Sequence, residues 1–496
     1  MNNLDAIPGL STFFGSSGSQ SLIIEGAPGT GKTTFALQIL ETFKSNYKGI
    51  YLSTRVGDSA LYQHFPWIKE LEEKTKIIDS GLLFLESLKI EVPETEQEHV
   101  ESARTFIRTI YGDQPNKASR ILYNKYFKDL NIPELKRIYS EVDHNLPDRS
   151  MIVIDSIEGL ASKYRINEEE LVYTLVKDLV EGGNTDIIFV LEKQRSENLE
   201  YIADGVIVLE QDLYDERIIR SLSIEKLRGI ESRFKKYLFT LKDGKFYVFS
   251  HPINLDVSKH FDFPISANEN NFSTGVKELD NILGGGYTYG SVNLIEYGEN
   301  VGLRHHILKR PIVANTLLLD HGILVALTLG DSIEDVRSKF STYINDKSRV
   351  DTHIIFIDYT RSNTDKEYII PLGNKNKEKT SELIQQAITK LKTFGSPVFY
   401  IMAFEAIEKY RGKLAIQETI EFVNSIIENK DIGILTLLPG AQNREHIINM
   451  ASTHIKLILI NNTLCLYGIN PKTNIYVIEP AEDSLTERFY KLTPIT

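Results

Sequence analysis

Gly26-Ala-Pro-Gly-Thr-Gly-Lys-Thr33 is the stretch that decides the fold of the first half of this chain. The run Ser21-Leu-Ile-Ile-Glu25 before it suits a buried strand, and residues 33–40 after it have the 3.6-residue apolar spacing of a helix. The octet matches the pattern G-x-x-x-x-G-K-[ST] in the strand-to-helix setting that this pattern requires. The sequence therefore predicts a phosphate-binding loop between a strand and a helix.

The residue types in this loop have chemical reasons. Glycines let backbone N–H groups approach phosphate oxygens from several sides. We expect Lys32 to reach the β and γ phosphates of a nucleoside triphosphate, and the Thr33 hydroxyl to coordinate Mg²⁺. The expected nucleotide-binding residues are Gly26, Ala27, Pro28, Gly29, Thr30, Gly31, Lys32, Thr33 and Thr34.

An acidic residue at the end of a second buried strand completes such a site. Ser150-Met-Ile-Val-Ile-Asp155 is an apolar run that ends in a carboxylate, and it predicts a buried strand with Asp155 at its carboxyl end. Asp155 is then expected to hold Mg²⁺ through the water shell of the ion, together with Thr33. The alternative is that Asp155 only caps a helix that begins near Glu158.

Further apolar runs alternate with helix-like segments, at residues 49–53, 76–79, 186–191 and 205–209. This alternation is typical of a three-layer α/β domain with a mainly parallel central sheet and its ligand at the carboxyl ends of the strands. The polar stretch at about residues 80–149 exceeds an ordinary crossover and predicts a helical insertion. It is either a surface for a partner or a solvated crossover without one.

The second half of the chain repeats the first half with its key positions changed. Residues 295–304 align with residues 24–33, and the replacements are Tyr297 for Gly26, Asn300 for Gly29, Leu303 for Lys32 and Arg304 for Thr33. The run 398–402 echoes the strand before Asp155 but ends at Met402 without an acid. We therefore expect an active domain at residues 1–255 and a degenerate pseudo-domain at residues 256–496.

The degenerate loop leaves open whether the second half binds anything. Arg304, His305 and His306 either receive an anion or form the solvated start of a helix. A conventional triphosphate site would lack its main counter-charges there.

Length and composition limit the class of protein. A chain of 496 residues, 42% of them hydrophobic, is long enough for two folded domains. The net charge of −12 argues against a surface that tracks a nucleic-acid backbone. Cys465 has no second cysteine to pair with, the first residues lack a secretory pattern, and no apolar run is long enough to span a membrane. We expect a cytoplasmic protein without a membrane span.

Three segments carry a resemblance to a known family. Residues 271–291 are similar to the S-T-G-x-x-x-L-D-x-x-L-G-G-G-x-x-x-G-S segment of KaiC-like and RecA-type ATPases. Residues 199–209 and Lys226-Leu-Arg-Gly229 resemble the A-D-G-V-I-x-L strand and the K-x-R-G turn of that family. As a tandem of two such domains, the chain is most similar to the archaeal KaiC-like group that includes the gas vesicle regulator GvpD.

The resemblance implies two RecA-like domains, ATP as the nucleotide, and assembly into homo-oligomers. It also implies that Lys226 and Arg228 act in trans, on the γ phosphate held by a neighbouring subunit. The alternative for these two residues is a surface hairpin of ordinary charge. Monomer, dimer and hexamer all stay open.

One departure from the family bears on catalysis. Active members usually carry one or two glutamates after the second strand, where a carboxylate orients the attacking water. Here Arg55 follows that strand, and an arginine can stabilise charge but cannot act as a base. Glu158 and Glu192 are the candidate substitutes. We therefore expect tight ATP binding with slow hydrolysis, that is, a weak ATPase.

Two classes of function remain. The first is an ATP-dependent regulator whose nucleotide state controls assembly or the binding of a regulatory protein partner. The second is a RecA/RadA-paralogue-type accessory ATPase of DNA recombination or repair, which the net acidity does not favour. Autophosphorylation, as in KaiC, is disfavoured because the second phosphate loop is broken.

Overall fold

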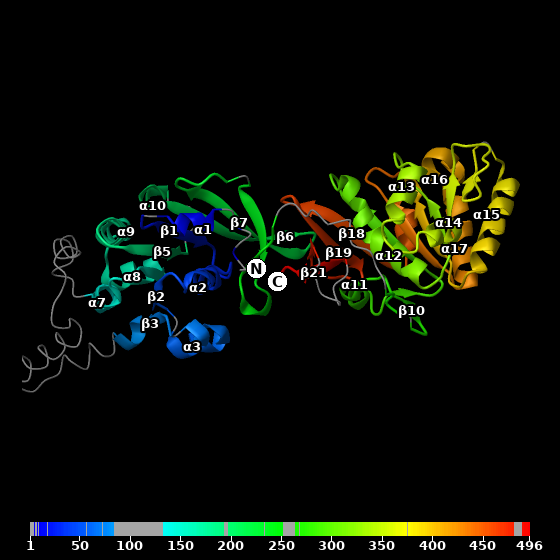
Figure 1. Cartoon of the computed structure of the whole chain (residues 1–496). Helices are drawn as coiled ribbons and strands as arrows, with labels where there is room; N and C mark the ends of the chain where they lie inside the picture. Colours follow the sequence, from blue (N-terminus) through cyan, green and yellow to red (C-terminus); the bar gives the residue numbers. More distant parts are fainter. Residues whose placement is uncertain are drawn as a thin grey trace, which may run out of the picture. The chain divides into compact units, whose positions relative to one another are not determined.

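The computed structural model divides the chain into two compact units (Figure 1). The first comprises Met1–His251 together with Ile495–Thr496, and the second comprises Pro252–Pro494. The structure describes residues 4, 7, 9–16, 18–55, 57–71, 73–83, 132–192, 197–232, 234–250, 263–266, 268–373, 375–480 and 489–496. Most of the insertion predicted at about residues 80–149 therefore lies outside the described residues.

A nine-stranded sheet forms the centre of the first unit, in the order β3-β2-β4-β5-β1-β6-β7-β8-β9. From β3 to β6 neighbouring strands pair parallel, and from β6 to β9 they pair antiparallel. The strands are β1 Ser21–Gly26, β2 Lys48–Ser53, β3 Thr75–Asp79, β4 Ser150–Asp155, β5 Thr185–Leu191, β6 Gly205–Tyr214, β7 Arg217–Leu227, β8 Lys236–Thr240 and β9 Tyr247–Val248.

Helices cover both faces of this sheet (Figure 1). Successive strand side chains point to opposite faces, so Ile24 packs with α1 and α2 while Ile23 packs with α7, α8 and α9. The result is the predicted three-layer unit. The helices are α1 Leu10–Phe14, α2 Lys32–Phe43, α3 Asp58–His64, α7 Pro133–Asn145, α8 Ile157–Tyr164, α9 Glu168–Leu175 and α10 Glu197–Ile202, with 3-10 turns at Pro66–Leu71 and Lys242–Gly244 and a π-helical turn at Val176–Glu181.

The second unit has a ten-stranded sheet, in the order β15-β14-β13-β16-β17-β12-β18-β19-β20-β21. It also changes from parallel to antiparallel pairing, at β18. The strands are β12 Ser291–Tyr297, β13 Ile323–Ala326, β14 Ile354–Asp358, β15 Ile369–Pro371, β16 Phe399–Ala403, β17 Ile432–Leu437, β18 Thr453–Ile460, β19 Thr463–Asn470, β20 Tyr476–Pro480 and β21 Tyr490–Pro494, and a separate pair is formed by β10 Asn271–Phe272 and β11 Tyr287–Thr288.

This sheet is again covered on both faces. Ile295 packs in one core with α12 and α13, and Leu294 packs in the other with α15, α16 and α17. The helices are α11 Lys277–Ile282, α12 His306–Leu318, α13 Ile333–Phe340, α14 Ser348–His353, α15 Lys377–Lys392, α16 Phe404–Arg411, α17 Ala415–Asn429 and α18 Arg444–Met450, with 3-10 turns at Gly302–His305 and Gly412–Leu414. The prediction of tandem RecA-like α/β domains is confirmed.

The family-like segment 271–291 has a local structural reason for its residue types. The carboxylate of Asp280 on α11 accepts hydrogen bonds from the backbone N–H of Thr274 at 2.7 Å and from the Ser273 and Thr274 hydroxyls. The bend between β10 and α11 is therefore held by the serine, threonine and aspartate of the motif.

The two sheets have the same strand order once β15 is set aside, so the halves are structural copies. Their registers refine the alignment. In the first unit Val190 on β5 pairs with Ile24 on β1 and with Asp155 on β4. In the second unit Thr436 on β17 pairs with Ile295 on β12 and with Ala403 on β16. Because Ile295 aligns with Ile24, Ala403 takes the place of Asp155. The position that corresponds to Asp155 is therefore one residue beyond Met402.

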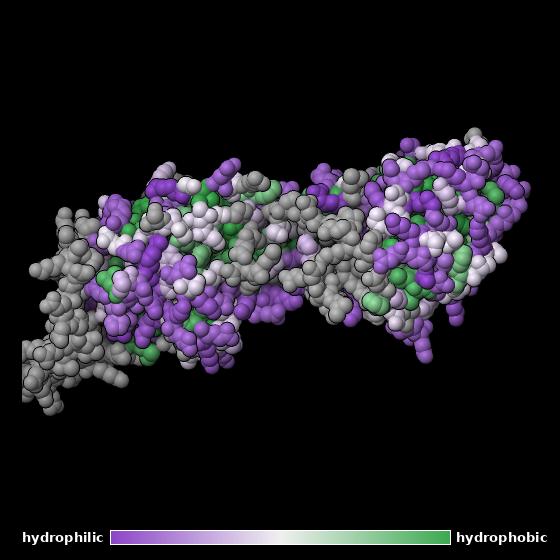
Figure 2. Space-filling model, in the orientation of Figure 1, coloured by the Kyte–Doolittle hydropathy of each residue, from purple (hydrophilic) through white to green (hydrophobic). Residues whose placement is uncertain are grey.

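Hydrophilic residues dominate the visible surface (Figure 2). The large apolar side chains that are exposed include Tyr201 on α10, Ile427 on α17 and Leu213 on β6, whose register partner Ile218 on β7 is exposed as well. Within the described residues, none of the helices combines the length and the apolar character that crossing a membrane needs.

Candidate phosphate-loop site

The predicted loop joins β1 to α2 at the carboxyl end of the sheet. Gly29 and Gly31 have φ angles of 82° and 100°, in the left-handed region that favours glycine. A Cβ on Gly26 would lie 2.5 Å from the carbonyl oxygen of Leu209 on the neighbouring β6. Positive φ angles and this close approach explain why the loop needs its glycines.

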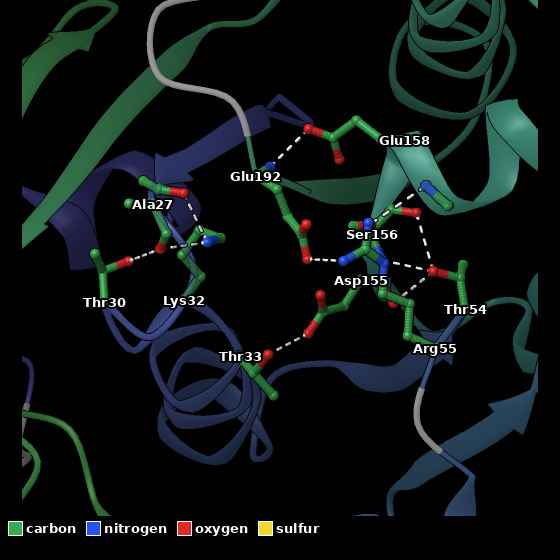
Figure 3. A network of polar contacts seen from close by, with 12 residues as sticks. Ala27, Thr30, Lys32, Thr33, Thr54, Arg55, Asp155, Ser156, Glu158 and Glu192 are labelled. Atoms are coloured by element: carbon green, nitrogen blue, oxygen red, sulfur yellow. Dashed lines mark hydrogen bonds and ion pairs between the residues drawn. The ribbon is translucent and has the colours of Figure 1, made fainter.

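Lys32 begins α2, and its side chain folds back over the loop (Figure 3). Its Nζ donates to the carbonyl oxygens of Gly26 at 2.7 Å and Ala27 at 2.9 Å. Burial lowers the pKa of Lys32, and the nearby carboxylates, Glu192 foremost, act in the opposite direction. The ammonium group therefore lies against the loop backbone, where it can meet an anion that the loop binds.

Asp155 and Thr33 are in direct contact. The Thr33 hydroxyl donates to Oδ2 of Asp155 at 2.6 Å, and the Tyr51 hydroxyl donates to the same oxygen at 2.8 Å. Burial raises the pKa of Asp155, against the effect of these two hydrogen bonds. The sequence analysis did not find Tyr51, because its position in β2 only becomes meaningful once β2 is known to pair with β4.

The helix-cap alternative for Asp155 is wrong. The N-cap of α8 is Ser156, whose hydroxyl accepts from the backbone N–H of Gly159 at 3.3 Å. The Thr54 hydroxyl in turn accepts from the backbone N–H of Ser156 at 2.9 Å, which holds the chain where it leaves β4. The carboxylate of Asp155 is left to face Thr33.

These oxygen groups fit Mg²⁺ as part of a nucleotide complex. Mg²⁺ takes oxygen ligands and usually keeps several waters, so one hydroxyl and one carboxylate suffice when phosphates supply the rest. Thr33 and Asp155 offer these two groups, 2.6 Å apart. Among the described residues no group of three or more His, Cys, Asp or Glu side chains could hold a metal by itself.

Three further charged residues border this site (Figure 3). Arg55, two residues after β2, forms an ion pair with Glu192, which directly follows β5. Glu158 on α8 is buried, and its Oε1 accepts from the backbone N–H of Glu192 at 2.6 Å. Glu158 therefore holds the main chain of Glu192, while the side chain of Glu192 approaches the loop.

Lys226 and Arg228 lie at the opposite end of the sheet. Strand β6 runs from Gly205, beside Leu22, towards the loop, and antiparallel β7 returns Leu227 to Gly205. The Lys226 ammonium donates to the carbonyl oxygens of Glu200 and Ala203, and Arg228 forms an ion pair with Asp204 at 2.7 Å. The structure does not bring these two residues to the loop of their own chain.

Another arginine does contact the loop. Arg220 on β7 donates from one terminal guanidinium nitrogen to the carbonyl oxygen of Gly29 at 3.0 Å. Its Nε donates to the carbonyl oxygen of Thr496 at 2.6 Å, and Thr496 and the buried Ile495 belong to this same unit. No sequence motif marks Arg220, because the contact depends on strand register.

The equivalent position in the second unit carries a large buried side chain. Tyr297, at the position of Gly26, is fully buried, and the Lys309 ammonium lies 5.9 Å from the centre of its ring. Lys309 donates to the Thr328 hydroxyl at 3.2 Å, and burial lowers its pKa. His306 lies 3.6 Å from a carboxylate oxygen of Asp331.

Of the three residues considered for an anion, His306 thus faces a carboxylate. Arg304 is exposed, and nothing is described of the side chains of Leu303 and His305.

The strand order and the loop after the first central strand define the first unit as a RecA-like P-loop domain. Comparison with known proteins agrees. Residues 10–225 match the family described as GvpD gas vesicle protein, P-loop domain. In sequence and in fold, the chain is similar to KaiC-like proteins of the RecA superfamily and to GvpD.

Individual relatives show how far the similarity extends. Protein GvpD2 of Halobacterium salinarum is 24% identical over 481 residues, which cover 93% of this chain and 90% of that protein. Protein GvpD1 of the same organism is 28% identical over 64% of this chain and 55% of its own length. The circadian clock oscillator protein KaiC of Synechococcus elongatus is 25% identical over 57% of this chain and 49% of its own length.

Proposed function

We propose that this protein is an ATP-binding regulator that hydrolyses ATP slowly in its first unit. In this proposal the nucleotide state controls the assembly of the protein into homo-oligomers or the binding of a regulatory protein partner. The observation that carries it is the arrangement of Lys32, Thr33 and Asp155 around a loop whose backbone geometry suits phosphate.

The loop residues would divide the work of binding. Backbone N–H groups of the glycine-rich turn and the N-terminus of α2 would bind phosphate oxygens, with Lys32 as the cation nearest to them. An incoming phosphate would replace the carbonyl oxygens of Gly26 and Ala27 as partners of the Lys32 ammonium. The exchange replaces a contact between a cation and neutral carbonyls by a contact between opposite charges, which favours the bound state.

Mg²⁺, when bound with ATP, would neutralise phosphate charge and polarise the γ phosphorus. Thr33 and Asp155 would hold it, and for this the Thr33 hydroxyl must turn from Asp155 to the ion. Tyr51 would keep the Asp155 carboxylate in place during this change.

Two observations support regulation over metabolic turnover. A second unit that keeps the strand order but buries Tyr297 in the place of the loop suits a scaffold or partner platform. Arg55 occupies the position where the family resemblance places the water-orienting glutamate, which suits slow hydrolysis. The relatives are described as gas vesicle and circadian clock oscillator proteins.

The test is ATP binding with Mg²⁺ by the purified full chain, with molecular mass measured with and without nucleotide. We expect Lys32→Ala to weaken binding about 100-fold, because it removes a charge-assisted contact. Lys177→Ala removes a surface lysine that pairs with Glu181 and serves as the matched control. Wild-type protein that binds no ATP would disprove the binding proposal, and a mass unchanged by ATP would leave partner binding as the regulated step.

A further inference from the structure

The charged residues beside the phosphate loop differ from the family pattern. The resemblance expects a glutamate after the second strand, where this chain has Arg55. A glutamate instead follows β5, and its Oε1 accepts from a guanidinium nitrogen of Arg55. The two charges thus face each other from separate strands.

Strand order explains why Glu192 reaches the site. Strand β5 lies between β4 and β1, so the residue after β5 lies between Asp155 and the phosphate loop. Glu192 contacts the Arg55 guanidinium through its Oε1 and donates its backbone N–H to Glu158. In Figure 3 its side chain extends between Lys32 and Arg55.

Glu158 is placed differently. It is buried on the first turn of α8, and its Oε1 is engaged by the backbone N–H of Glu192. In Figure 3 its carboxylate points towards that backbone nitrogen. Glu158 is therefore a positioning residue for the end of β5.

We propose that Glu192 is the catalytic carboxylate that orients the attacking water, and that Arg55 is its positioning residue. This inference rests on the proposed ATPase function. The water oxygen forms a bond to the γ phosphorus while the bond from that phosphorus to the bridging oxygen breaks, and ADP leaves with the electron pair. One proton of the water passes to Glu192, which later releases it to solvent.

The same pair accounts for slow turnover. The side chain of Arg55 is 52% exposed and that of Glu192 is 28% exposed, so their ion pair is in partial contact with solvent and weak. A γ phosphate can therefore compete for the guanidinium, which releases the carboxylate towards the water. Hydrolysis then depends on a side-chain rearrangement that a permanently free glutamate would not need.

Single-turnover hydrolysis and ATP affinity, measured on Glu192→Gln and Glu158→Gln, test the assignment. We expect Glu192→Gln to slow hydrolysis about 100-fold, the usual contribution of a general base, and to change ATP affinity less than about threefold. Glu158→Gln keeps an oxygen that can accept from the Glu192 backbone, so its loss should stay below about tenfold. Glu181→Gln, in a surface pair, is the matched control.

The role of Arg55 is tested by exchange. The double variant Arg55→Glu with Glu192→Arg restores a glutamate after β2, and it should recover much of the hydrolysis that Glu192→Gln loses. Arg55→Lys should keep more activity than Arg55→Ala, because a cation is retained.

The outcomes separate the two proposals. A Glu192→Gln variant that hydrolyses ATP like wild type, or a Glu158→Gln variant that loses more, would overturn the assignment while ATP binding stands. Hydrolysis by wild-type protein no faster than by Lys32→Ala would overturn it as well. Failure of the wild type to bind ATP would instead refute the proposed function itself.

Discussion

The two units have the same strand order but differ in the segment after their first central strand. After β1 a glycine turn leaves the loop backbone accessible, and Lys32 lies over it. At the end of β12 the side chain of Tyr297 is buried. Lys309, on the following helix α12, is buried beside the Tyr297 ring. The difference teaches that the RecA-like strand order is kept even where a buried aromatic side chain takes the position of the first glycine of the loop.

The largest expected difference between the units is in nucleotide stoichiometry. Isothermal titration should find one ATP per chain, and Lys32→Ala should abolish it at concentrations near the wild-type Kd. Leu303→Ala, the matched change in the second unit, should leave both affinity and stoichiometry unaltered.

A graft sharpens this prediction. Leu303→Lys, Arg304→Thr and Ala403→Asp together restore the lost groups, yet Tyr297 still fills the place of Gly26. We expect no second ATP from this triple variant. A stoichiometry of two would show that the charges alone were missing.

The second prediction concerns a carboxylate in the second unit. Burial tends to raise the pKa of Glu296 on β12, but hydrogen bonds from His454 and Arg444 outweigh it and lower the pKa to about 2. A lowered pKa means stability that is present above the unfolded value and lost as pH falls towards 2. Glu296→Gln should destabilise the second unit by about 2 to 3 kcal/mol at neutral pH.

Hydrogen exchange resolved by peptide measures this effect for each unit separately. The difference between Glu296→Gln and wild type should shrink as pH falls below about 4.5, the unfolded value for glutamate. A difference that is independent of pH would mean that packing, not charge, holds Glu296.

The third prediction has the opposite sign, in the first unit. Burial raises the pKa of Asp155, so the stability linked to this group is present at low pH and lost as pH rises through the raised pKa. Without nucleotide, Asp155→Asn should therefore make the first unit more stable at neutral pH. It should also weaken Mg²⁺-dependent ATP binding about tenfold, as loss of a group that orients the metal shell does.

These two effects are measured by hydrogen exchange without nucleotide and by ATP titration with and without Mg²⁺. Loss of stability in Asp155→Asn would show that its bonds to Thr33 and Tyr51 outweigh the cost of burying the charge.

The smallest effect is expected at Arg228. Its ion pair with Asp204 is on the surface, so Arg228→Ala should cost at most about 1 kcal/mol of stability. ATP affinity should change less than about twofold, since Arg228 lies far from its own loop. If Arg228 acts in trans, the hydrolysis rate per chain should rise with protein concentration in wild type and be independent of concentration in Arg228→Ala. A rate that is independent of concentration in both proteins would mean that Arg228 only forms its surface ion pair with Asp204.

Sequence patterns predicted the parts of the site that are local. The loop from Gly26 to Thr33 and the strand that ends at Asp155 are contiguous motifs, and the duplication of the domain followed from aligning the two halves. The roles of Glu158 and Glu192 could not be separated, because they depend on which side chain meets the end of β5. Tyr51 was not predicted because its contact with Asp155 depends on the pairing of β2 with β4.

Other expectations stay predictions. The DNA-related alternative, the cytoplasmic location and the action of Lys226 and Arg228 in trans are tested neither by the structure nor by the comparisons with known proteins. The alignment of the lost acid was off by one residue, at Met402 instead of Ala403, since an apolar run gives no register by itself.

The placement of Ile495 and Thr496 in the first unit bears on how that unit is made. Ile495 is 1% exposed, and Thr496 shares Arg220 with the phosphate loop. During synthesis the residues up to His251 emerge long before these two, so the first unit must wait for the second half to be translated before its packing is complete. A fragment cut at His251 would lack the same contacts, and Arg220 would keep Gly29 as its partner without Thr496.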